Sequence, residues 1–394
     1  AGSTEFQAHV VTARTNGTLS LYGNVYTDNN ANLTDSTSFN QPNILSTAIG
    51  ESGTINLFGQ VRDTVDGALM QVGDTDDSAT RLGRNHSMAF QMRGHDEINV
   101  NAYQQWNATG AIFATQGYFR VMYDPAASGL DGGGFQTEAA KLAITQAGTW
   151  NDLWLGGPQN SLGVANSATN AYNGHLMLTK ADQVLNWGQR VQISNNNRNH
   201  TLTLGGEHDS GTAYIGSADN NSAYRLLYQN SNSERDLRIL QVRGGTLVVN
   251  ARLEDGNTTA DSFNSTVSIV GPGTVEFNRN SAGSSTVDRW NFMAGTAIWG
   301  QMTGNNQFAR TRGTGINAIA SVSTWGGGDL IVGREGDAAA RTQTLDGNIY
   351  LLNGASSATV LQAKTLTLGA AARTLTRREG SSIAFYENGT GAIN

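Results

Sequence analysis

Short runs in which apolar and small polar residues alternate recur along almost the whole chain, and they constrain the fold more than any other feature. Examples are residues 19–23 (LSLYG), 201–205 (TLTLG) and 364–369 (KTLTLG). Successive side chains of a strand point to opposite faces, so a period of two predicts short, half-buried β-strands. Asn-Gly and Asp-Gly dipeptides between the runs predict tight turns. Only residues 137–146 (TEAAKLAITQ) have helical propensity, and even there Leu142 and Ile144 alternate as in a strand.

Degenerate internal repeats favour a repetitive all-β scaffold. Three segments place an apolar residue and Gly before a small or acidic loop that ends in Arg, and a Trp-Gly-Gln triplet also recurs. The three segments are Val72-Gly73 to Arg81, Ile215-Gly216 to Arg225 and Val332-Gly333 to Arg341. The triplets are Trp187-Gly188-Gln189 and Trp299-Gly300-Gln301. We therefore expect an all-β, right-handed parallel β-helix, or solenoid, with coils of roughly 20 to 30 residues. Tandem β-sandwich or jelly-roll domains remain the alternative.

Composition excludes several classes of function. The 394 residues include 48 Gly and no Cys, and only 14% are charged, with a net charge of −7 and no basic stripe. Nucleic-acid binding is therefore not expected, since it relies on clustered Lys and Arg. Thiolate catalysis and thiolate metal sites are excluded. No apolar run approaches the roughly 18 residues of a membrane-spanning helix.

Four segments carry a family resemblance: residues 201–207, 257–280, 328–355 and 364–377. Each resembles the repeats of autotransporter passenger domains and of autotransporter-associated β-strand repeat proteins, in which an apolar strand ends in Gly and a small-residue loop leads to a Gly-Thr-Leu/Val strand. The resemblance is clear from residue 153 onward and weak before residue 150. We therefore predict a β-helix-like repeat region at 151–394 and an N-terminal β region at 1–150, which is either a cap or a separate β domain.

The resemblance implies an extracellular or cell-surface bacterial protein that is used for adhesion, surface coating or filament formation, usually without catalysis. The opening Ala1-Gly2-Ser3-Thr4 also looks like a mature end left after signal-peptide removal. We therefore expect a secreted protein that is not an enzyme.

Few residues suggest metal or catalytic chemistry. The six histidines are dispersed, and for the cluster Glu207-His208-Asp209 we expect a solvated turn. Asp74, Asp76 and Asp77 offer oxygen ligands in one loop, which suit Ca²⁺. A structural use of such acidic corners, paired with Arg81, Arg225 or Arg341, competes with this metal site. No other cofactor is expected.

Candidate interaction residues are apolar and lie in two settings. Trp150 and Trp154 would share one face of a strand, where they could stack on sugar rings, anchor a second subunit or pack in the core. The segments around Phe6 and Val10 and around Phe385 and Tyr386 look like strands without charged caps. Uncapped strand edges pair readily with other chains.

These ends suggest a function. We expect a structural protein whose subunits self-assemble, through strand and coil-end contacts, into an extracellular filament or surface layer. The alternative is a tailspike-like β-helix adhesin that binds or cleaves carbohydrate. The expected partners are copies of the chain itself and, in the alternative, extracellular glycans.

Overall fold

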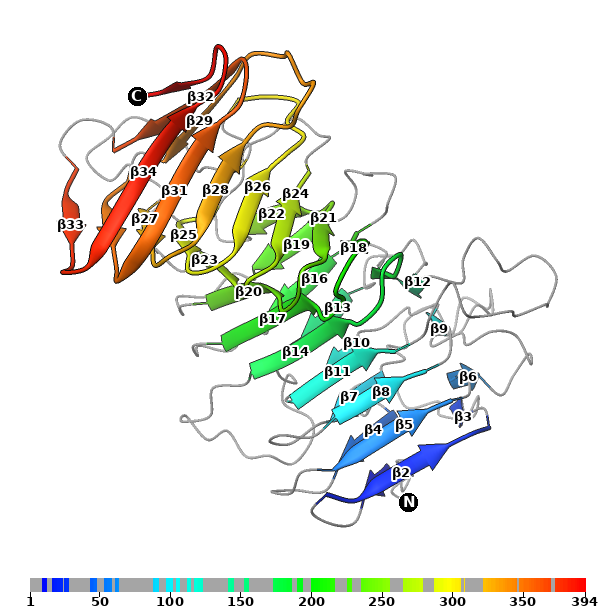
Figure 1. Cartoon of the computed structure of the whole chain (residues 1–394). Helices are drawn as coiled ribbons and strands as arrows, with labels where there is room; N and C mark the ends of the chain where they lie inside the picture. Colours follow the sequence, from blue (N-terminus) through cyan, green and yellow to red (C-terminus); the bar gives the residue numbers. More distant parts are fainter. Residues whose placement is uncertain are drawn as a thin grey trace, which may run out of the picture. The chain divides into compact units, whose positions relative to one another are not determined.

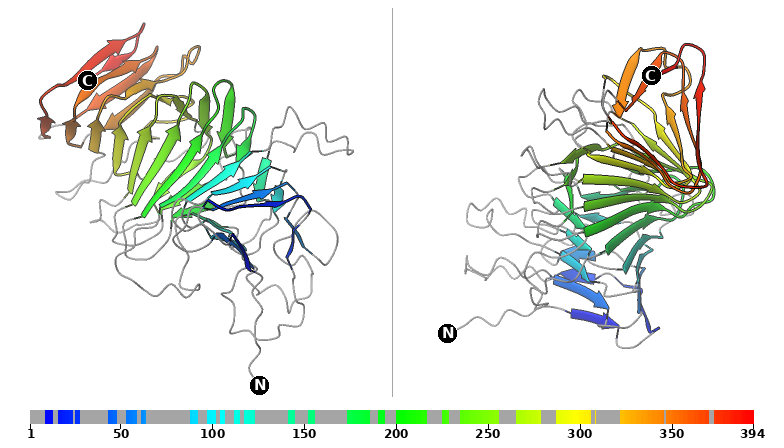
Figure 2. Two further views of the ribbon diagram at one scale, coloured as in Figure 1. Left: turned by 60° about the horizontal axis from the view of Figure 1, so that its bottom comes forward. Right: turned by 90° about the vertical axis from the view of Figure 1, so that its left-hand side faces the viewer.

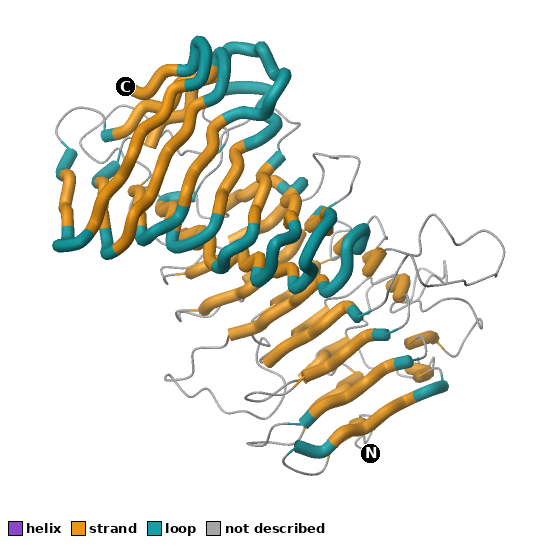
Figure 3. Tube along the Cα trace, viewed as in Figure 1, coloured by secondary structure: helices purple, strands orange, loops and turns teal. Residues whose placement is uncertain are grey.

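The structure is a computed structural model of the whole chain. It describes residues 9–12, 16–23, 25–27, 43–47, 53–58, 61–63, 88–91, 97–101, 104–106, 112–114, 117–122, 141–144, 152–155, 173–185, 190–193, 200–216, 225–228, 235–255, 265–278, 287–305, 308, 322–345, 347–369 and 373–394. These residues form strands and turns, with no helix among them (Figures 1 and 3). The all-β prediction is therefore confirmed.

The chain divides into two compact units, Ala1–Ser194 and Asn195–Asn394. Each unit is described by itself. The division predicted from sequence at residue 150 stays a prediction.

The first unit consists of parallel sheets. Its strands are β1 (His9–Thr12), β2 (Thr18–Leu21), β3 (Val25–Thr27), β4 (Asn43–Thr47), β5 (Thr54–Leu57), β6 (Val61–Asp63), β7 (Met88–Gln91), β8 (Glu97–Val100), β9 (Gln104–Trp106), β10 (Ile112–Ala114), β11 (Gly117–Val121), β12 (Lys141–Ile144), β13 (Asp152–Leu155), β14 (Asn173–Leu178), β15 (Val184–Leu185) and β16 (Arg190–Ile193). They pair in the orders β1-β4-β7-β10-β13-β16, β2-β5-β8-β11-β14, β9-β12-β15 and β3-β6. The segment with helical propensity therefore contains a strand, β12.

The second unit repeats this arrangement. Its strands are β17 (His200–Gly206), β18 (Thr212–Ile215), β19 (Arg225–Tyr228), β20 (Arg235–Gln241), β21 (Thr246–Val249), β22 (Arg252–Asp255), β23 (Ser265–Val270), β24 (Thr274–Phe277), β25 (Arg289–Phe292), β26 (Thr296–Trp299), β27 (Val322–Trp325), β28 (Asp329–Val332), β29 (Arg341–Leu345), β30 (Ile349–Leu351), β31 (Gly354–Val360), β32 (Lys364–Leu368), β33 (Leu375–Arg377), β34 (Ser381–Glu387) and β35 (Ala392–Ile393). The sheet orders are β17-β20-β23-β25-β27-β30-β33, β18-β21-β24-β26-β28-β31-β34, β19-β22 and β29-β32-β35.

Strands that follow one another in the chain lie in different sheets, and within each unit the sheets add their strands in chain order (Figure 2). Every strand pair whose register is described is parallel, for example β28 with β31 and β31 with β34. Such short parallel strands are compatible with a β-helix. They do not fit the antiparallel pairing of sandwiches and jelly rolls.

The coil length varies along the chain. The sequence separation between residues that are hydrogen-bonded across adjacent coils measures the coil length. Near the C-terminus this separation is 26 to 28 residues, within the expected 20 to 30. In the first unit the corresponding separations, from Ser20 to Asn56 and from Asn56 to Asn99, are 36 and 43. The expected coil length is therefore wrong for these early coils.

The core of the second unit consists of apolar residues stacked in register. One buried column contains Leu204, Ile239, Ile269, Phe292, Trp325 and Leu351. A second contains Ile215, Val249, Phe277, Trp299, Val332 and Val360. The Phe292 and Trp325 ring centroids are 4.5 Å apart, and those of Trp299 and Phe308 are 5.4 Å apart. The Trp of the second Trp-Gly-Gln triplet is thus a core residue.

Gly-Thr corners explain part of the repeated sequence. The motif begins β18, β21, β24 and β26, and the Thr246 and Thr296 amides donate to the Gly211 and Gly273 carbonyls of the preceding coil at 2.9 and 3.1 Å. A Cβ on Gly273 would overlap the Arg243 carbonyl oxygen. Glycine is required there because two coils approach closely.

Candidate assembly surface at the last coil

The last coil presents the candidate interaction surface. We define the terminal surface as Leu375, Arg377, Phe385, Tyr386 and Glu387, on β33 and β34. Both strands stand at the end of their sheet order. All seven residues of β34 pair with β31, and no strand in the described part of the chain pairs with the other edge of β34. Such an edge presents main-chain donors and acceptors to a further strand.

Phe385 continues a buried column but is itself partly exposed. The preceding members of its column, in register, are Ala213, Leu247, Val275, Ala297, Leu330 and Ala358. Each of them is fully buried, whereas Phe385 is 49% exposed. Leu375, which follows Ile349 on the neighbouring sheet, is also exposed. A coil stacked on this surface would cover both side chains.

Two charged residues of the last coil are in register with buried apolar residues of the coil before it. Arg377 is in register with Leu351, and Glu387 is in register with Val360. Arg377 Nε donates to the Ser381 carbonyl at 3.0 Å, and Glu387 Oε1 accepts from the Ile393 amide at 2.7 Å. The sequence-based expectation that this end has no charged cap is therefore wrong, because register places both charges on core columns. Inward-pointing charges oppose unselective pairing at a sheet edge.

Tyr386 lies on the opposite face of β34 from Phe385 and is 57% exposed. The two predicted contact residues are thus accessible. Of the other candidates, Val10 and Trp154 lie in β1 and β13, whereas Phe6 and Trp150 lie outside the described residues. So do Asp74, Asp76 and Asp77. Within the described ranges, no group of three or more His, Cys, Asp or Glu could hold a metal ion.

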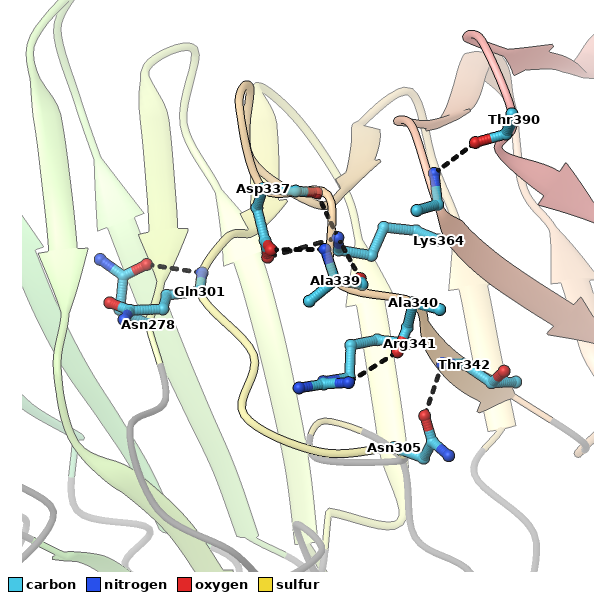
Figure 4. A network of polar contacts seen from close by, with 11 residues as sticks. Asn278, Gln301, Asn305, Asp337, Ala339, Ala340, Arg341, Thr342, Lys364 and Thr390 are labelled. Carbon is cyan, nitrogen blue, oxygen red and sulfur yellow. Dashed lines mark hydrogen bonds and ion pairs between the residues drawn. The ribbon is translucent and has the colours of Figure 1, made fainter.

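A buried lysine holds the acidic loop at 333–340, as Figure 4 shows. Lys364 Nζ donates to the Asp337 and Ala339 carbonyls, both at 2.8 Å, and lies 3.3 Å from Asp337 Oδ2. Arg341, the predicted partner, instead donates to the Ala340 carbonyl at 2.7 Å. The acidic corner therefore has a structural cation, supplied by the next coil. Sequence reasoning missed it, although Lys364 is one of only three lysines.

The turn at His208 is also different from the expected one. His208 is buried, and its Nε2 lies 3.1 Å from the Thr246 carbonyl oxygen. The Gln241 side-chain amide donates to the His208 carbonyl at 3.0 Å. A Cβ on Gly245 would overlap the imidazole. The histidine therefore packs in a coil corner, where glycine leaves room for it.

Among the described residues, no helix is long and apolar enough to cross a membrane. Comparison with known proteins found no matching family model, no matching curated protein and no matching solved structure.

Proposed function

We propose that this chain is a secreted structural protein, a right-handed parallel β-helix of the autotransporter passenger type. It self-assembles outside the cell into a filament or surface layer through coil-end contacts. The observation that carries the proposal is the half-exposed Phe385 at the end of an otherwise fully buried column. No catalytic role is proposed.

A second copy of the chain fits this surface because the coils already stack by the required contact. The β34 edge would take a parallel strand as β31 takes β34. In the first unit, β1 and β2 also end their sheet orders. Contact between unlike ends is heterologous, and it gives an open filament where its rotation does not close a ring.

The apolar contribution is modest. Fully burying one large apolar side chain is worth about 1.5–3 kcal/mol. Covering the exposed parts of Leu375, Phe385 and Tyr386 therefore contributes on the order of 4 kcal/mol, against an association cost of about 4–15 kcal/mol. Main-chain pairing along β34 has to supply the remainder. The assembly is therefore weak, and it depends on protein concentration.

Arg377 and Glu387 make the contact selective. A coil that covers them with apolar side chains would bury unpaired charge, which is costly. A partner has to leave both groups their present main-chain hydrogen bonds or to supply new ones. The two charges therefore set the register of the contact.

The test is sedimentation velocity over a concentration series of the 394-residue chain, followed by negative-stain electron microscopy. We expect larger species that grow with concentration, and filaments with a regular repeat. Phe385→Ser should reduce the association. Tyr350→Ser, which alters a partly exposed tyrosine one coil earlier, should not.

Thermal melting checks that both variants fold, and Leu375→Ser provides a second probe of the same surface. Monomers at every concentration, or equal effects of Phe385→Ser and Tyr350→Ser, would contradict the proposal.

A further inference from the structure

A second exposed aromatic feature lies in the first unit, where Tyr22 follows β2 and Phe58 follows β5. Leu21 pairs with Leu57, and the Phe58 amide donates to the Leu21 carbonyl at 2.8 Å. The two rings therefore sit on successive coils. Their centroids are 4.8 Å apart, and their planes differ by 6°.

This aromatic pair remains largely in water. Tyr22 is 77% exposed and Phe58 is 43% exposed. Phe58 stacks on one face of the Tyr22 ring, and the exposure of Tyr22 shows that the described residues leave most of this side chain uncovered. Aromatic rings contribute most to stability when they are buried, so folding gains little from Tyr22. An exposed aromatic platform is better suited to binding a ligand than to stabilising the fold.

A polar ladder runs beside the rings on the same face of the sheet. Ser20 lies two residues before Tyr22, and Asn56 lies two residues before Phe58, so each shares a face of the sheet with its ring. Asn56 is in register with Ser20 and with Asn99. Asn56 Nδ2 donates to Ser20 Oγ at 3.4 Å, and Asn99 Nδ2 donates to Asn56 Oδ1 at 3.0 Å. Each carboxamide nitrogen has two N–H groups, and among the described residues each of these two nitrogens donates to one acceptor.

The charges nearby restrict the ligand. Neither β2 (TLSL) nor β5 (TINL) contains a charged residue. On the next strand, Glu97 is in register with Thr54. A ligand for this face therefore needs an apolar ring face and many neutral hydroxyl groups.

We propose that this face binds a neutral glycan. A pyranose ring stacks on the exposed ring of Tyr22, and its hydroxyl groups bond to the Ser20 and Asn56 side chains. This site is separate from the terminal surface and does not depend on self-assembly. The role of Trp150 and Trp154 in sugar stacking stays a prediction.

Saturation-transfer NMR with the 394-residue chain provides the test. The probes are the neutral oligosaccharides cellohexaose, laminarihexaose and chitohexaose, with trigalacturonic acid as the acidic comparison. At least one neutral probe should bind, and 1 M NaCl should not weaken its binding. Tyr22→Ser should weaken binding about tenfold, as expected when an aromatic contact worth about 1.4 kcal/mol is lost. The matched control Tyr350→Ser should leave it unchanged.

Phe58→Leu keeps an apolar side chain and removes the stacked ring, so it should weaken binding less than Tyr22→Ser. Circular dichroism melting shows whether each variant folds. The proposal is overturned if no neutral probe binds, if trigalacturonic acid binds best, or if Tyr22→Ser leaves the affinity unchanged. It is also overturned if Tyr22→Ser alters only the sedimentation of the chain, because the aromatic pair would then be a contact between copies.

Discussion

Replacing Lys364 by Met tests how the coils of the second unit are joined. The Lys364 side chain is fully buried, and its Nζ contacts two carbonyl oxygens and the Asp337 carboxylate. Methionine has a similar shape but neither charge nor donors. The substitution therefore isolates the polar contacts from the packing.

The expected loss follows from the groups left without a partner. Removing one member of a buried ion pair costs about 3–5 kcal/mol, and a buried carbonyl left without a donor costs about 1–3 kcal/mol. Asp337 remains 27% exposed, so water can solvate its carboxylate and lower the cost. We expect a loss of about 3 kcal/mol, which lowers Tm by about 6–12 °C in a unit of this size.

Arg243→Met is the matched control. Arg243 and Asp209 are 3.1 Å apart, closer than Lys364 and Asp337, but their side chains are 55% and 78% exposed. Exposed pairs contribute only about 0–1 kcal/mol. The shorter ion pair should therefore contribute less to stability.

Urea unfolding, followed by tryptophan fluorescence, provides the measurement. The buried Trp290, Trp299 and Trp325 of the same unit contribute to this signal. The reasoning fails if Lys364→Met costs no more than Arg243→Met. It also fails if Lys364→Met changes the slope of the urea transition without moving its midpoint, since the effect would then lie outside native-state stability.

Three further predictions concern the coil corners, the core and the last coil. Gly273→Ala should lower the free energy of unfolding by about 1–3 kcal/mol, because the added methyl group meets the Arg243 carbonyl. Gly23→Ala should be nearly neutral, because a Cβ there meets no atom within 4 Å. Urea unfolding compares the two variants. Trp299→Ala should lower the free energy of unfolding, measured by urea unfolding, by about 3–5 kcal/mol. A loss below about 1 kcal/mol would contradict the position of Trp299 in the core. The double variant Arg377→Leu and Glu387→Leu should associate more readily than the native chain, and unchanged light scattering would show that these charges do not limit pairing.

The sequence alone was sufficient to predict an all-β fold of short strands and to place several of those strands. Alternation is a local property, so runs such as 201–205 and 364–369 predict β17 and β32 without knowledge of their neighbours. The helix-like composition of 137–146 did not override this signal. Phe385 and Tyr386, which the sequence indicates as interaction candidates, are exposed, and their role in assembly stays a prediction.

Only the tertiary structure decided which residues share a column. Tyr22 meets Phe58, Lys364 meets Asp337, and Arg377 follows Leu351 because coils stack in register. Their sequence separations cannot be predicted, since longer loops cost little extra closure entropy and coil length is therefore free to vary. Burial of His208 depends in the same way on Gly245 one coil later. Local pattern determines the strands, whereas register between coils determines the sites.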